Sequence, residues 1–260
     1  MKHRIYWAFL PLFLFTIGCE TVEEPPETIC LPMNISITLV QGSQTSKIIA
    51  DFNYLPGTDQ LDHITWSNHQ THYFEYDEMD RLRTLRIMDV EAKVQEESWF
   101  VYEGLKVVRV DLVKRNLDYT RLEPLDSVYT GYVEFEYEGA NIVEEFEYEI
   151  SADGFREEYV RHVSYTYDVR GNLTFMVELD PASGETRETT LTYDQNKHPF
   201  YDPGYYFHGE TYVNNMLTRT DGDFKYTYET LLNEYTYPET VYEKLGSAYS
   251  RIINYSYEIL

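Results

Sequence analysis

Cysteine is scarce in this chain, because only Cys19 and Cys30 occur in 260 residues. Two cysteines cannot form a framework of several intramolecular disulfides. A disulfide-stapled scaffold is therefore excluded. Cys30 is predicted to be a small buried residue at the start of the first strand. The chain is long enough to bury a core without staples.

Basic residues are also few. The sequence has 21 Lys and Arg against 45 Asp and Glu, which gives a formal net charge of −24. Nucleic acids and anionic lipid surfaces are bound through basic surfaces. The composition therefore excludes nucleic acid as a partner, and attachment to a membrane requires a separate anchor.

Motifs for catalysis and metal binding are missing from the sequence. It contains no HExxH, no GxSxG and no phosphate-binding glycine loop. His69 and His72 lie three residues apart but have no third ligand at a usable spacing. Glutamate doublets such as Glu96-Glu97 and Glu144-Glu145 place their side chains on opposite faces of a strand, and we expect them to be solvated. No catalytic residue, metal site or cofactor is predicted.

A long apolar run is absent as well, since the apolar stretch near the N-terminus covers only Ile5 to Ile17. Such a stretch is too short to cross a bilayer as a helix, which takes about 20 residues. Basic residues precede it and Gly18 follows it. This pattern predicts a secretory signal peptide over residues 1–18.

The residues Thr16-Ile17-Gly18-Cys19 resemble the lipobox of bacterial lipoproteins, although Thr16 stands where leucine is usual. The resemblance implies that Cys19 is acylated and becomes the new N-terminus; the alternative is an ordinary signal peptide beside a coincidental cysteine. Cleavage would remove two basic residues and no acidic one, and so would change the net charge from −24 to −26. The lipid would then be the sole source of membrane affinity.

Residues 19–30 are predicted to form an acidic tether, because glutamate and proline dominate them. An acidic patch after the lipidated cysteine resembles the surface-export signal of Bacteroidota lipoproteins, and a plain spacer is the alternative. Residues 31–260 are predicted to form a single β domain built from repeats.

The repeat consists of two aromatic rings two residues apart, followed by a turn. Residues two apart in a strand share a face, so each element should place both rings on one side of a sheet. Turns rich in Asp, Asn and Gly follow most of these elements, as in Asp168-Val169-Arg170-Gly171-Asn172. The elements are Phe52-Asn53-Tyr54, Phe74-Glu75-Tyr76, Phe100-Val101-Tyr102, Phe135-Glu136-Tyr137, Phe146-Glu147-Tyr148, Tyr165-Thr166-Tyr167, Tyr226-Thr227-Tyr228, Tyr235-Thr236-Tyr237 and Tyr255-Ser256-Tyr257, and Leu191-Thr192-Tyr193 is a variant with one ring.

Returning strands should alternate in the same way, with Leu173, Phe175, Val177 and Leu179 on one face. No stretch shows a helical period. The sequence therefore predicts an all-β fold, a long antiparallel meander of repeated hairpins. A sheet of a dozen or more strands twists, so it should curl into a barrel, half-barrel or superroll.

The segment Tyr165-Thr166-Tyr167-Asp168-Val169-Arg170-Gly171-Asn172-Leu173-Thr174 resembles the YD repeat of Rhs-type proteins. Tyr76-Asp77 with Arg81-Leu82 is a weaker copy. Over most of residues 47–258 the chain is similar to uncharacterised Bacteroidota lipoproteins built from tyrosine-rich hairpins, some of them described as having a porin-like sheet. The resemblance implies a fold and an outer-membrane address facing periplasm or cell surface. It implies no activity.

Tyrosine and tryptophan remain as candidates for binding. The sequence holds 26 tyrosines, which can form cross-strand ladders or contact sugars and protein partners. Trp66 and Trp99 are the candidate ligand platform. We expect a non-enzymatic, lipid-anchored envelope protein that acts as a binding or structural module. The alternatives are a glycan-binding or glycan-active surface protein with a carboxylate pair, and an assembly or export partner with an open edge strand or exposed apolar patch.

Overall fold

The computed structural model describes residues 30–89, 94–118, 123–151, 154–200 and 213–259. The predicted signal peptide, Cys19 and the tether up to residue 29 lie outside them. Cys30, the last residue of the predicted tether, begins the first strand and is fully buried. Its predicted position and burial are confirmed.

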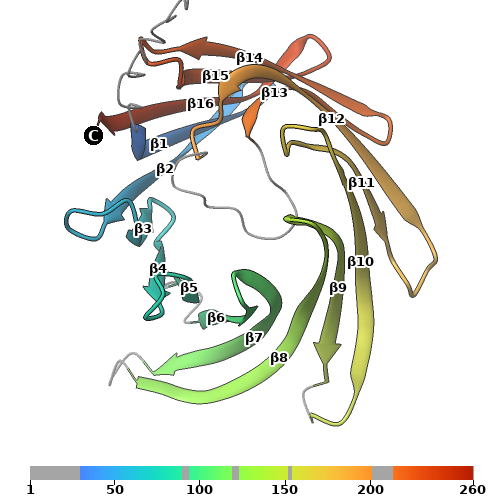
Figure 1. Ribbon diagram of the computed structural model, residues 1–260. Helices are drawn as coiled ribbons and strands as arrows, with labels where there is room; N and C mark the ends of the chain where they lie inside the picture. Colours follow the sequence, from blue (N-terminus) through green and yellow to red (C-terminus); the bar gives the residue numbers. More distant parts are fainter. Residues whose placement is uncertain (1–29, 90–93, 119–122, 152–153, 201–212, 260) are drawn as a thin grey trace, which may run out of the picture.

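In the described part of the chain, sixteen strands form one antiparallel sheet in which each strand pairs with its neighbours in sequence, and β1 also pairs with β16. The sheet therefore closes into a barrel (Figure 1). The strands are β1 (Cys30–Gln41), β2 (Gln44–Tyr54), β3 (Leu61–Trp66), β4 (Gln70–Tyr76), β5 (Leu82–Asp89), β6 (Val94–Glu103), β7 (Lys106–Asp118), β8 (Glu123–Glu138), β9 (Asn141–Ile150), β10 (Glu157–Tyr167), β11 (Leu173–Leu179), β12 (Thr186–Lys197), β13 (Asn214–Asp221), β14 (Phe224–Leu232), β15 (Pro238–Leu245) and β16 (Ala248–Ile259). The predicted all-β meander is confirmed, and the barrel is the shape it takes. None of the described residues belongs to a helix able to cross a bilayer.

Phe200, just after β12, shows which face of the sheet points into the barrel. Its ring centroid lies 5.9 Å from that of Phe52 on β2. Five strands separate β12 from β2 on the shorter way round the barrel, so this contact must be made through the interior. We call the face that carries Phe52 the inner face, and the opposite one the outer face.

The inner face carries the apolar core. Three clusters of buried side chains lie on it, centred on Phe52, Tyr165 and Val133. Full burial of a large apolar side chain contributes about 1.5–3 kcal/mol, so these clusters supply the main driving force for closure. Their buried members are Ile35, Ala50, Phe52, Leu61, Ile64, Phe74, Val110, Val133, Phe135, Val163, Tyr165, Leu173, Met176 and Leu191.

Three hairpin turns are built on one side-chain arrangement, in which Asp77, Asp168 or Asn233 opens the turn. The Oδ1 atom of each accepts hydrogen bonds from the backbone N–H groups two and four residues later. The fourth residue of each turn has a positive φ, and only in the turn opened by Asp168 is it a glycine, Gly171. The turn chemistry that the sequence indicates at Asp168 therefore also forms where glycine is missing.

A one-residue β-bulge lies near the start of several strands, just after the turn that precedes each of them. In β11, for example, Leu173 pairs with Tyr167 and Phe175 with Thr166, so Thr174 has no partner in register. The same shift occurs at Asp62 in β3, Arg83 in β5 and Val108 in β7. A bulge breaks the main-chain ladder and leaves nearby backbone groups without their usual partners.

Tyrosine hydroxyls lie at the points where these bulges interrupt the main-chain ladder. Tyrosines at or near the ends of β2, β6, β8, β12 and β16 each donate a hydrogen bond to the carbonyl of the residue next to the bulge in the preceding strand. The donor–acceptor distances are 2.6–2.8 Å. We call the donors the tyrosine row: Tyr54, Tyr102, Tyr137, Tyr193 and Tyr257, which donate to Pro32, Leu82, Val107, Leu173 and Pro238 respectively.

The bulges overturn the predicted face of some side chains. Leu173 lies in the inner core, but Phe175 and Val177 point outward and Met176 takes the inner position. The prediction that Leu173 and Phe175 share a face is wrong, because the extra residue at Thr174 shifts the two-residue alternation by one.

One of the aromatic pairs departs from the prediction, because Tyr235 lies in a turn before β15. Phe146 and Tyr148 share a face as predicted, but they pair with Glu134 and Tyr132 and lie on the outer face. In β9 a glutamate takes the inner position beside Phe135, since Glu145 pairs with Phe135 in register. Period-two patterns cannot distinguish the two faces when both carry aromatic or charged residues.

Glu145 is 1% exposed, so the prediction that the glutamate doublets are solvated is wrong at this position. Its carboxylate accepts hydrogen bonds from Arg161 at 2.7 Å and from Tyr165 at 2.8 Å. Arg161 also donates to Glu178 at 2.8 Å. Burial alone would lower the pKa of Arg161, but Glu145 and Glu178 raise it, so the ion pair stays charged.

The tyrosine row can be tested with Tyr102→Phe. This change leaves the Leu82 carbonyl without its donor, and we expect a loss of about 1–2 kcal/mol in the free energy of unfolding measured in urea. Tyr73→Phe is the control, because the Tyr73 hydroxyl makes no hydrogen bond within the described part of the chain. Equal losses in both variants would contradict the role given to the row.

Candidate ligand site

The structure separates the two tryptophans of the predicted ligand platform. Trp66 ends β3 on the inner face, where it packs against the Phe52 cluster with its ring 5.7 Å from that of His72. Trp99 lies on the outer face of β6 and is 47% exposed. The pair therefore cannot form one platform, and Trp99 alone is available to a ligand from solution.

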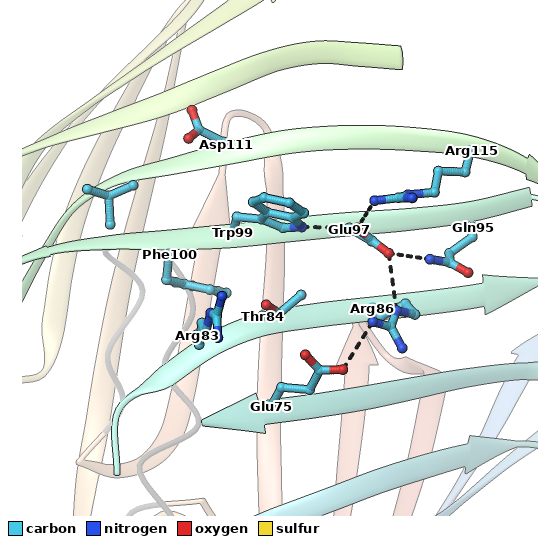
Figure 2. A pocket seen from close by; sticks show the side chains of 11 residues that line it. Glu75, Arg83, Thr84, Arg86, Gln95, Glu97, Trp99, Phe100, Asp111 and Arg115 are labelled. Carbon is cyan, nitrogen blue, oxygen red and sulfur yellow. Dashed lines mark hydrogen bonds and ion pairs between the residues drawn. The ribbon is translucent and has the colours of Figure 1, made fainter. Parts of the chain in front are cut away.

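Trp99 stands in a hollow of about 520 Å³ on the outer face of β4, β5, β6 and β7 (Figure 2). Its ring has no aromatic or cationic partner among the described residues. Around it lie charged and polar side chains from all four strands. The lining residues are Glu75, Arg83, Thr84, Arg86, Gln95, Glu97, Trp99, Phe100, Val101, Asp111 and Arg115. We call this the Trp99 hollow.

Glu97 forms the floor of the hollow and is only 5% exposed. Its carboxylate accepts hydrogen bonds from Trp99 Nε1 at 3.0 Å, Arg115 at 3.0 Å and Arg86 Nε at 3.2 Å, and from Gln95. Figure 2 shows these donors converging on it from three strands. The network fixes the indole edge and leaves the ring face open.

Burial by itself would raise the pKa of the Glu97 carboxyl. The hydrogen bond from Trp99 and the charges of Arg115 and Arg86 outweigh it and hold the pKa below its ordinary value of 4.5. Glu97 is therefore an anion at neutral pH and serves as a fixed acceptor. The sequence prediction that Glu96-Glu97 is solvated is wrong for Glu97, which the flanking cations make stable in a buried position.

Further carboxylates and cations lie around Trp99. Glu75 pairs with Arg86 at 3.0 Å, and Asp111 accepts from Arg109 at 2.7 Å and from the Tyr129 hydroxyl at 2.8 Å. Planar polar groups at the edge of an exposed aromatic ring suit a ligand that has both an apolar face and equatorial hydroxyls, such as a sugar.

The neighbouring aromatic side chains on the outer face do not extend this platform. The rings of Tyr132 and Tyr148 stack on each other at 4.7 Å, and the Arg109 guanidinium lies 3.7 Å from the other face of Tyr132. Tyr159 follows at 5.4 Å from Tyr148. Because these rings use their faces on one another, they form a cross-strand ladder, the structural role considered for the tyrosines in the sequence.

The two histidines considered as metal ligands are also separated. His69 lies in the turn before β4 with a positive φ of 68°, while His72 is on the inner face beside Trp66. Burial lowers the pKa of His72. Among the described residues no group of three potential ligands comes together.

The structure resembles solved porin-like proteins. It superposes on one from Bacteroides vulgatus with a TM-score of 0.54 and 11% identity, covering 88% of this chain and 99% of that one. A porin-like protein from Bacteroides uniformis gives a TM-score of 0.54 and 12% identity, over 87% of this chain and 96% of that one. At this identity the likeness establishes the fold, a closed antiparallel barrel, and nothing finer.

No family model and no curated protein matches the chain. A chain of the Photorhabdus luminescens Tc holotoxin pore overlaps with a TM-score of only 0.32. The resemblance to Rhs-type repeats and the lipid on Cys19 therefore stay predictions.

The charge on Glu97 makes the stability of the hollow depend on pH. The folded pKa lies below the ordinary value, so the ionised carboxylate stabilises the fold above about pH 4.5, and this contribution is lost as the pH falls through the lowered folded pKa. We expect Glu97→Gln to cost about 2 kcal/mol at pH 7 and progressively less below pH 4.5, as measured by thermal unfolding.

Glu96→Gln is the matched control for this measurement, because Glu96 is exposed and pairs only with Lys114. It should change the stability by less than about 0.5 kcal/mol at any pH. A loss in Glu97→Gln that does not vary with pH would show that the charge is not what stabilises the hollow.

Proposed function

We propose that this protein is a non-enzymatic binding module of the bacterial cell envelope that holds carbohydrate in the Trp99 hollow. The observation that carries the proposal is the exposed ring of Trp99 beside a buried, fully hydrogen-bonded carboxylate. A flat apolar ring with fixed polar groups at its edge binds the apolar face of a sugar while the polar groups bind its hydroxyls. Such a site needs no catalytic residue.

The polarity of the outer face supports the proposal that the barrel wall is in contact with water. Charged side chains occur on it in most strands, whereas the inner face holds the apolar core. Transmembrane barrels have the opposite pattern, and each Lys or Arg facing lipid at the midplane costs about 2–4 kcal/mol. Outward charges include Lys47, Glu75, Arg86, Glu134, Glu136, Glu144, Glu188, Lys225, Glu229 and Lys244.

Attachment to the envelope is proposed to come from lipid on Cys19, with the signal peptide removed. The fold shared with porin-like Bacteroides proteins supports an envelope location. Because the wall is charged, the anchor would be the only part of the protein in the bilayer.

A glycan-active enzyme is less well supported by the hollow. A general acid in a glycosidase needs a raised pKa, whereas the pKa of Glu97 is lowered. An assembly partner that adds a strand is also less well supported, because β1 pairs with β16 and the described strands leave no open edge.

The anchor is tested with Cys19→Ser in the full chain. We expect the native protein to partition into the detergent phase and to incorporate labelled palmitate, and the variant to stay in the aqueous phase without label. A variant that still enters detergent would mean that the barrel wall itself contacts lipid, and retained label would exclude Cys19 as the acylated residue.

Carbohydrate binding is tested with neutral hexasaccharides derived from cellulose, starch and xylan, by isothermal titration against the Cys19→Ser protein. We expect at least one to bind and Trp99→Ala to weaken it at least tenfold, because the stacking surface is lost. Tyr249→Ala, which removes an aromatic ring of similar exposure on distant β16, should leave the affinity unchanged. Equal affinity in Trp99→Ala and the unmodified barrel would refute this site.

A further inference from the structure

A second hollow lies on the inner face, near the β1–β2 and β15–β16 turns, with a volume of about 550 Å³. It is separate from the Trp99 hollow, since the two share no residue. One part of its wall is apolar and another carries three arginines from β12, β13 and β16. Its lining residues are Leu39, Val40, Gln41, Arg187, Met216, Arg219, Asp221, Tyr226, Tyr228, Glu243, Leu245, Ser250, Arg251 and Ile253. We call it the arginine hollow.

The carboxylates of the hollow already have partners. Asp221 is 6% exposed; it accepts two hydrogen bonds from Arg187 and one from Arg219 at 3.3 Å. The hydrogen bonds and charges of Arg187 and then Arg219 lower the pKa of Asp221. Glu243 is 7% exposed and accepts from Ser250 Oγ at 2.7 Å and from the Tyr228 hydroxyl at 3.1 Å.

Two of the arginines, by contrast, keep most of their donors. A guanidinium has five N–H groups. Arg219 uses one in its bond to Asp221, and its Nε is buried without a partner. Arg251 makes no hydrogen bond within the described residues and only a 3.8 Å ion pair with Glu243. Both side chains are about 40% exposed, so solutes can reach them.

The local charge also differs from that of the whole chain. Three arginines against two carboxylates leave one positive charge in the hollow, in a protein of net charge −24. Distant acids are screened beyond about 8 Å at physiological salt, so the nearby guanidinium groups determine which ion is attracted. Guanidinium donors fit the oxygens of a carboxylate or phosphate in pairs.

The apolar part of the wall indicates that the ligand is more than an inorganic ion. Leu39, Met216 and Ile253 face the same space as Arg219 and Arg251. Each CH₂ group removed from water contributes about 0.8 kcal/mol, so a short hydrocarbon body would add substantially to an anionic head. A volume of this size lies within the range of small-molecule pockets.

We infer that the arginine hollow binds an anionic amphiphile, with a phosphate or carboxylate head on Arg219 and Arg251 and an apolar body against Leu39, Met216 and Ile253. The barrel thus has two sites of different chemistry, an outer one for carbohydrate and an inner one for an amphiphilic anion. The inner site does not depend on the outer one.

The test uses dodecyl phosphate below its micelle concentration, titrated into the Cys19→Ser protein. Inorganic phosphate and dodecyl maltoside are the comparison probes, which present the head and the body separately. We expect dodecyl phosphate to bind at least tenfold more tightly than either. Comparable binding of inorganic phosphate would overturn the apolar part of the site, and comparable binding of dodecyl maltoside would overturn the anionic part.

Variants then locate the site. Arg219→Gln combined with Arg251→Gln should weaken dodecyl phosphate at least tenfold, while Arg170→Gln, in an exposed turn, should not. Leu39→Trp fills the hollow without removing a charge and should weaken binding too, which keeps the test valid if the double variant is unstable. Unchanged affinity in Leu39→Trp and in a folded double variant would refute the proposal.

Discussion

The hydrogen bond from a tyrosine hydroxyl to a backbone carbonyl is the interaction on which the closed sheet depends. Beside each bulge the main-chain ladder between paired strands stops, and the strands would separate there with unpaired carbonyls inside the barrel. The tyrosine row supplies the missing donors at five such places. At about 1 kcal/mol each, these bonds together approach the lower end of the total stability of an ordinary domain. Burial raises the pKa of Tyr102 and of Tyr137, so these hydroxyls remain donors at all physiological pH values.

The polarity of the two faces follows from the same repeat. In the repeat elements whose rings point inward, the residue between the two rings points outward, and it is commonly charged or polar, as with Glu75 and Glu136. The repeat therefore places apolar rings on the inner face, beside buried ion pairs such as that of Glu145 and Arg161, and charged side chains on the wall. A charged wall is the reverse of a lipid-embedded barrel. This chain and the porin-like proteins can share a fold and still differ in what surrounds the barrel. The fold is defined by strand pairing, whereas the polarity of the wall is defined by the side chains that point outward.

Ionic groups define both hollows. On the outer face, Glu97 is held as an anion by Trp99, Arg115 and Arg86, and this leaves an aromatic ring fixed and exposed. On the inner face, Asp221 and Glu243 are satisfied by neighbours, while Arg219 and Arg251 keep free donors. Removing one partner of a buried ion pair leaves an uncompensated charge, which is costly. The charged groups therefore fix the geometry of each hollow.

The sequence by itself determined that this protein is built from β-strands joined by tight turns. The paired rings, the Asp-led turns and the lack of a helical period predicted an all-β meander, and Trp99 was among its candidate residues. Only the tertiary structure decided that the sheet closes, that Phe175 points outward after the bulge at Thr174, and that Trp66 is enclosed. It also decided that Glu97 and Glu145 are buried, because the arginines that pair with them, Arg115 and Arg161, lie on neighbouring strands. The physical reason is that alternation is a local property, whereas bulges, register and charge pairing are set between strands that are distant in sequence.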